Sequence, residues 1–173
     1  MRDPLFRMAL LLGLLSAVGP FAIDMYLPAL PQVASDLGTT EAGAALTLTS
    51  YFIVFGFAQM IYGPMADAVG RKKPLVIGVA IFLAATVAAS LAPTIGWLIA
   101  ARAVQGLGAA TLMAVPRAVI RDMATGPAAA KMMAAIMIVI SVSPMLAPLT
   151  GSAVMAWGSW REIFAVLAGA ALL

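Results

Sequence analysis

The stretch GPMADAVGRKK, residues 63–73, separates two long uncharged parts of a 173-residue chain. Residues 42–66 and 74–101 around it contain no Asp, Glu, Lys or Arg, and neither do residues 132–160. Each of these stretches exceeds the ~20 apolar residues that a helix needs to cross a bilayer. Charged residues at the ends of long apolar segments are typical of a multi-span membrane protein.

The overall composition agrees with this interpretation. Hydrophobic residues make up 64% of the chain and charged residues 10%, against roughly a quarter charged in soluble domains. A soluble protein would need apolar helices packed inside a globule larger than this chain can form. The basic residues are not interleaved with aromatic ones, so we expect no nucleic acid partner.

The absence of two residue types excludes several chemistries. The chain has no Cys and no His, which removes disulfides, thiolate metal sites and the commonest general base. We therefore expect neither an enzyme nor a metal site. Arg2 and Arg7 before an apolar stretch resemble a signal peptide, but that stretch continues to Pro28 without a small-residue cleavage site. We interpret it as a retained first helix.

Breaks at charged residues, Pro and Gly predict an all-α integral membrane fold with five complete helices and a truncated sixth. The expected ranges are 7–31, 42–66, 74–92, 95–120, 132–156 and 163–173. The last range gives only ~17 Å of helix against a hydrocarbon core of ~30 Å.

The positions of Lys and Arg predict the orientation. Most of the 10 basic residues lie on alternate connections, namely Arg2, Arg7, Arg71, Lys72, Lys73, Arg117, Arg121 and Lys131. The opposite connections carry Asp36, Glu41 and the pair Arg161 and Glu162. Cytoplasmic loops are enriched in Lys and Arg, so we expect a cytoplasmic amino terminus and a place in the cell inner membrane.

Residues 63–73 contain more than a positive turn. Glycines permit a sharp reversal, and an acid and a base four residues apart can pair. The order resembles the signature loop of the major facilitator superfamily, G-x-L-x-D-x-x-G-R-K/R-x, with Met65 in place of Leu. The resemblance implies a cytoplasmic latch between two six-helix halves, made by Gly63, Asp67, Gly70, Arg71 and Lys72, with Asp122 as charge partner.

A second pattern, RAVQGLGAA, occupies residues 102–110. Its small residues allow close helix packing, and its order is similar to the family motif R-x-x-Q-G-x-G-A-A, in which Gln105, Gly106 and Gly108 match. Arg102 is costly inside an apolar run, so it should face the bundle interior beside an anion. The alternative is that its guanidinium snorkels to the outer surface.

Asp24 is the expected anion. It is the sole charge between Met8 and Ser35. Counting inward from the outer helix ends puts Asp24 and Arg102 at one depth, ~10 to 12 Å below the surface. We hypothesise that they pair, or exchange partners, in a cavity where Asp24 takes up and releases a proton.

Two further segments resemble drug:proton antiporters of the bicyclomycin-resistance (Bcr/CflA) type. The first is AIDMYLPALP, residues 22–31. The second is SPMLAPLTGS, residues 143–152, where Pro144, Pro148 and Gly151 predict a bend and a close helix contact. This second segment is similar to the antiporter motif G-P-x-x-G-G, although Ala147 and Ser152 replace two glycines. In the first helix, Pro20 and Pro28 should distort the backbone and free carbonyl groups for a cavity. A structural kink alone would explain these two prolines but would not explain Asp24.

The resemblance implies a function. Members have twelve helices in two halves and bind substrate between them, so residues 1–173 are expected to be the amino-terminal half, with a carboxy-terminal six-helix half missing. We expect export of drugs or small metabolites, driven by the proton gradient without a cofactor, in a lipid bilayer. Tyr26, Tyr51 and Gln59 are candidates for the wall of a small-molecule substrate cavity.

Alternatives remain at this point. The chain, as a truncated product, would insert without transporting anything. Two copies, or a separately encoded second half, would assemble into a working transporter. Within the same superfamily, the solute would be a sugar or another metabolite.

Overall fold

The computed structural model describes residues 4–172, so that Arg2 and Leu173 lie outside the described part, and these residues form helices and no strands. The predicted all-α class is confirmed. The elements are α1 Pro4–Asp24, the 3-10 helix η1 Leu27–Ala29, α2 Leu30–Asp36, α3 Glu41–Val69, α4 Lys72–Ser90, α5 Ile95–Met123, α6 Gly126–Trp157 and α7 Trp160–Ala171.

Five spans are long and apolar enough to cross a membrane, as the sequence predicts: residues 7–36, 41–69, 72–90, 95–123 and 126–157. α7 has 12 residues, about 18 Å of helix, which is less than a bilayer crossing requires.

Helix ends differ from the sequence-based ranges mainly because a charge does not stop a helix. α6 begins at Gly126 rather than at 132, since Pro127 occupies its first turn, where the missing N–H has no role. Polar caps begin other helices: Thr40 accepts from the Gly43 N–H, and Thr94 accepts from the Trp97 N–H. Ser159 and Glu162 form a capping box at the start of α7.

The first span is interrupted, whereas the sequence predicted one helix over residues 7–31. α1 ends at Asp24, a turn follows, and the chain then continues through η1 and α2 as far as Asp36. Pro28 and Pro31 start these two short helices, at positions where the N–H is not needed. The last 12 residues of the span, 25–36, therefore do not belong to α1.

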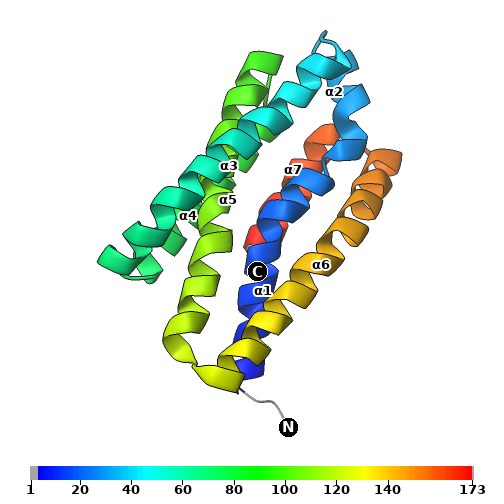
Figure 1. Cartoon of the computed structure of the whole chain (residues 1–173). Helices are drawn as coiled ribbons and strands as arrows, with labels where there is room; N and C mark the ends of the chain where they lie inside the picture. Colours follow the sequence, from blue (N-terminus) through cyan, green and yellow to red (C-terminus); the bar gives the residue numbers. More distant parts are fainter. Residues whose placement is uncertain (1–3, 173) are drawn as a thin grey trace.

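The helices pack in an exchanged order. α1 packs on α6, while α5 packs on α3 and α4. The first three spans are α1 with α2, then α3, then α4, and the next three helices are α5, α6 and α7. The first member of each set packs on the second member of the other set, α1 on α6 and α5 on α3. Figure 1 shows α3, α4 and α5 together and, beside them, α1, α6 and α7. Inverted repeats of three helices in transporters have this arrangement.

The basic residues gather at one end of the bundle. Ala9 of α1 packs with Ile120 of α5 and Met132 of α6, and Arg71 contacts Asp122. The chain segments that carry Arg7, residues 71–73, Arg117, Arg121 and Lys131 therefore meet there. The other end joins α2 to α7 and α7 to the end of α4, through Trp160 with Asp36 and Arg161 with Ala92.

The outer surface is apolar. Large hydrophobic side chains are exposed along several spans, among them Phe57 at 68%, Met60 at 74% and Leu91 at 73%. Such exposure would be costly in water, at about 25 cal/mol per Å². It is the expected surface of helices that face lipid or other helices.

Candidate functional site

A buried arginine lies at the centre of the candidate site. Arg102, on α5, has no exposed surface. Its Nη1 donates hydrogen bonds to the Ala22 carbonyl oxygen of α1 at 3.3 Å and to Gln105 Oε1 at 2.6 Å. The side chain therefore points into the bundle, as the sequence predicts, and does not snorkel.

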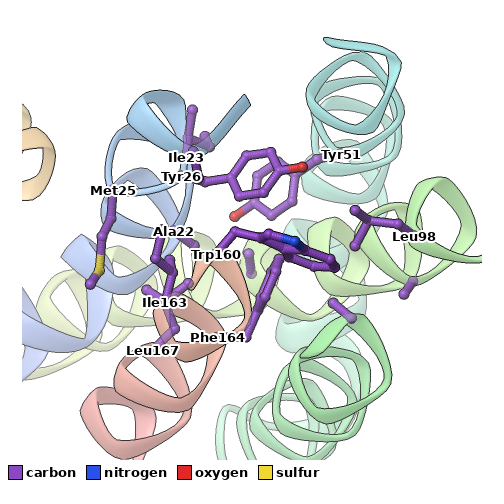
Figure 2. Packing of buried hydrophobic residues seen from close by; sticks show 14 of the residues in the cluster. Ala22, Ile23, Met25, Tyr26, Tyr51, Leu98, Trp160, Ile163, Phe164 and Leu167 are labelled. Carbon is purple, nitrogen blue, oxygen red and sulfur yellow. The ribbon is translucent and has the colours of Figure 1, made fainter. Parts of the chain in front are cut away.

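Aromatic rings surround the guanidinium. Its carbon lies 4.7 Å from the ring centroid of Tyr26, 4.6 Å from that of Tyr51 and 5.9 Å from that of Phe164. Figure 2 shows the rings of Tyr26, Tyr51, Phe164 and Trp160 gathered in one cluster. Each desolvated cation–π contact contributes about 2 kcal/mol, which offsets part of the several kcal/mol needed to bury the charge.

Hydrogen bonds hold the two tyrosine rings in place. The Tyr51 hydroxyl donates to the Gly19 carbonyl oxygen at 3.0 Å, which links α3 to α1. A hydrogen bond of 3.1 Å joins Tyr26 Oη and Thr47 Oγ1, which links the break in the first span to α3. The two tyrosine rings are therefore held in place by bonds between helices. We call the rings of Tyr26, Tyr51 and Phe164 around the guanidinium the aromatic cage.

A polar chain leads away from Arg102. Gln105 accepts from the guanidinium and donates from Nε2 to Thr86 Oγ1 of α4 at 2.7 Å. The Thr86 hydroxyl donates to the Phe82 carbonyl oxygen at 2.6 Å. Arg102, Gln105 and Thr86 have no exposed surface. Within residues 4–172, Arg102 Nε and Nη2 have no hydrogen-bond partner, so the cation keeps unused donor capacity.

The hypothesised ion pair between Asp24 and Arg102 is not formed. Across the side chains that the structure describes, Asp24 has no ion pair. Ala22 and Tyr26 face Arg102, and Asp24 lies between them in sequence; a residue two positions along a helix points about 200° away. Asp24 is half-buried at the end of α1, next to the break in the first span.

The three residues expected to line a substrate cavity lie elsewhere in this structure. Tyr26 and Tyr51 have no exposed surface and contact Arg102 instead of lining an open cavity. Gln59 is half-buried between α3 and α5, where its Nε2 lies 3.5 Å from Met113 Sδ. In this conformation the two rings hold the cation, and their faces are not free for another ligand.

The latch residues meet at the positive end. Arg71 donates from Nε to Asp122 Oδ2 at 2.7 Å and lies 2.5 Å from Asp67 Oδ1. The hydrogen bond to Asp122 is the main cause that raises the pKa of Arg71, so its charge persists at any physiological pH. Gly70 has φ +84 in this turn, a conformation that favours glycine. Gly63 and Lys72 flank the ion-paired residues.

Glycines at the predicted packing motif touch neighbouring backbones. A Cβ added to Gly106 would lie 2.5 Å from the Tyr51 carbonyl oxygen of α3, and one on Gly108 would lie 2.5 Å from the Phe82 nitrogen of α4. α5 therefore approaches both neighbours closely.

The helix α6 has one comparable contact. A Cβ on Gly151 would overlap the Met25 carbonyl oxygen at the break in the first span. Pro144 and Pro148 lie inside α6, which continues as one helix through both.

Sequence reasoning missed two parts of the site. Thr86 is an isolated hydroxyl in an alanine-rich helix, and nothing in the pattern distinguishes it. Trp160 was not singled out, but its N–H donates to Gln32 Oε1 at 3.0 Å and its indole Nε1 to Asp36 Oδ2 at 2.9 Å. This fixes α2 to α7 beside Phe164. The only sequence signal was the aromatic type next to a helix cap.

Comparisons with known proteins agree with the motifs. The sequence profile described as Major Facilitator Superfamily matches residues 12–173. An uncharacterised MFS-type transporter of Bacillus subtilis, YdgK, is 40% identical over 162 residues, which are 92% of this chain and 40% of the relative. The bicyclomycin resistance protein homolog of Haemophilus influenzae is 32% identical over 97% of this chain and 42% of the relative.

A solved structure has the same fold. A crystal structure of a mutant of the peptide transporter POT matches 96% of this chain and 36% of its own, with a TM-score of 0.79 and 17% identity. At this identity the likeness concerns the fold alone. The chain spans about two fifths of the length of these two curated relatives.

Proposed function

Because this chain belongs to the major facilitator superfamily, we propose that it exports drugs or small metabolites from the cell in exchange for protons. It is a multi-pass membrane protein and a transporter rather than an enzyme. A relative whose name refers to bicyclomycin resistance supports a drug as the solute. Membership of the superfamily does not specify the direction of transport or its energy source, so export and proton coupling are parts of our proposal.

The buried cation is the single observation that carries the proposal. Arg102 is fully buried, and among the side chains that the structure describes it has no carboxylate partner and two of its nitrogens have no hydrogen bond. An intramembrane charge without a counter-ion is costly to maintain, which supports a functional role. Asp24, half-buried at the end of α1, is the proposed proton carrier, and the cation beside the break in the first span favours its ionised form when the two approach.

The proposed transporter needs helices beyond those in this chain. α3, α4 and α6 have only 28%, 33% and 22% of an apolar stretch buried, against 56% and 61% for the first span and α5. The relatives are more than twice as long as the matched part. We propose a second six-helix half against α3 and α6, with the substrate bound between the halves and alternating access by rocking.

The proposed orientation predicts which residues an outside reagent reaches. The chain has no native cysteine, so Ser35→Cys in α2 and Ala68→Cys in α3 place single thiols on exposed positions near opposite ends. A membrane-impermeant maleimide added to intact cells should label Ser35→Cys and leave Ala68→Cys unlabelled. Everted vesicles should give the reverse. Labelling of Ala68→Cys from outside would contradict a cytoplasmic positive end.

The proposed export is tested by drug accumulation. Cells that express the protein from its gene should accumulate less bicyclomycin than cells that express Asp24→Asn, and an uncoupler should remove the difference. Thr49→Val, which changes a side chain that bonds only within its own helix α3, is the matched control and should behave like the wild type. Equal accumulation in wild-type and Asp24→Asn cells would contradict the role proposed for Asp24.

A further inference from the structure

One buried hydroxyl on α4 stands outside every motif. Thr86 has no exposed surface and is the contact through which α4 reaches the polar chain of Arg102. Its hydrogen bond to Gln105 is 2.7 Å long and joins two different helices. Several hydroxyls in this structure bond only to a carbonyl of their own helix; for example, Thr111 donates to Gly108 at 2.6 Å and Ser16 to Leu12 at 2.8 Å. Thr86 therefore does more than donate its hydrogen to its own helix, because its oxygen also accepts from Gln105 on α5.

The geometry determines which atoms of Gln105 face each neighbour. The hydroxyl of Thr86 has one hydrogen, which goes to the Phe82 carbonyl oxygen at 2.6 Å. Only lone pairs then face Gln105, so the amide must present its NH₂ group to Thr86. The amide oxygen consequently points to Arg102 Nη1, 2.6 Å away. A reversed amide would place two donors against each other at the guanidinium and two acceptors against each other at Thr86.

We propose that Thr86 is a positioning residue: its hydroxyl fixes the orientation of the Gln105 amide, and thereby the place of the Arg102 guanidinium between Tyr26 and Tyr51. The inference rests on the proposed proton exchange for its consequence in transport. Its structural part stands on the hydrogen bonds alone. A displacement of α4 relative to α5 would release the amide and free the cation to find another partner.

A double-mutant cycle tests the structural part without transport. Thr86→Val keeps the shape but leaves a buried amide group unpaired, and it should lower the melting temperature of the purified protein by about 3 to 10 °C. In a Gln105→Leu background the same change should have little effect, because no amide is left to orient. Thr86→Ser should melt like the wild type, and so should Thr111→Val. Equal effects of Thr86→Val in both backgrounds would overturn the inference.

Transport by proteoliposomes tests the consequence. With bicyclomycin as probe, Thr86→Val should lower gradient-driven uptake about tenfold, as expected when a buried amide loses its hydrogen-bond partner. Exchange of labelled for unlabelled bicyclomycin without a gradient should change far less, and Thr86→Ser should restore the gradient-driven rate. An equal loss of both rates would overturn the positioning role. A wild-type protein without gradient dependence would contradict the proposed function, and the melting cycle would then decide on Thr86.

Discussion

Arg102→Met is expected to abolish gradient-driven export, with a loss of at least about 100-fold, while the protein still folds. The methionine side chain fills a similar volume between Tyr26 and Tyr51 and makes favourable contacts with aromatic rings. The change removes a buried charge that has no carboxylate partner among the described side chains, and it leaves the Gln105 amide oxygen unpaired. These effects oppose each other, so the melting temperature should stay close to that of the wild type. Loss of function with retained stability is the signature of a residue kept for its chemistry.

Arg102→Lys separates the charge from the geometry. The ammonium keeps the charge, but it is a compact group that cannot stack on two rings while it donates to the Ala22 carbonyl and to Gln105. We expect its gradient-driven export to be nearly as low as that of Arg102→Met. Export by both variants at the wild-type rate, measured in everted vesicles with equal protein content, would contradict a central role of the cage.

Gly108→Ala should strongly lower the stability of the protein. The added methyl group would lie 2.5 Å from the Phe82 nitrogen and 2.7 Å from the Gly78 carbonyl oxygen, both of which are backbone atoms of α4. Backbone atoms cannot rotate aside, so α4 and α5 must separate, at a cost of about 3 kcal/mol or more. Such a shift would also lengthen the 2.7 Å bond between Gln105 and Thr86.

Gly96→Ala is the matched control for this prediction. Gly96 lies in the same helix, and a Cβ there would meet nothing within 4 Å. Alanine at this position should leave stability unchanged or raise it by up to about 1 kcal/mol, because it restricts the unfolded chain. Thermal melting in detergent compares the two variants. If Gly108→Ala melted at the same temperature as Gly96→Ala, the close approach of α4 and α5 would be refuted.

Much of the fold could be predicted from sequence because hydrophobic length and charge placement act along the chain. Uncharged runs predicted the spans, and the basic residues predicted their common end. The break at Met25 and Tyr26 was not predicted, because prolines at 28 and 31 are equally compatible with a kinked continuous helix. The start of α6 was also missed, at Gly126 instead of residue 132, since helical hydrogen bonds extend beyond the apolar run.

The candidate site was predictable only in part. The cost of a buried guanidinium correctly predicted that Arg102 faces the interior. The expected pair with Asp24 failed because counting residues gives depth along a helix but not direction around it. The aromatic cage depends on rings from α3, α7 and the broken span that meet only in three dimensions. Thr86 has no sequence signal at all, since its role comes from its distance to Gln105.

Proton-coupled export is tested most directly with the protein in liposomes under an imposed pH gradient. A pH-sensitive dye inside the vesicles reports proton movement, and labelled bicyclomycin reports the solute. We predict that protons leaving down their gradient drive bicyclomycin in the opposite direction against its own gradient, and that Arg102→Met stops both movements. Bicyclomycin that equilibrates at the same rate with and without the gradient, with no movement of protons, would contradict the account.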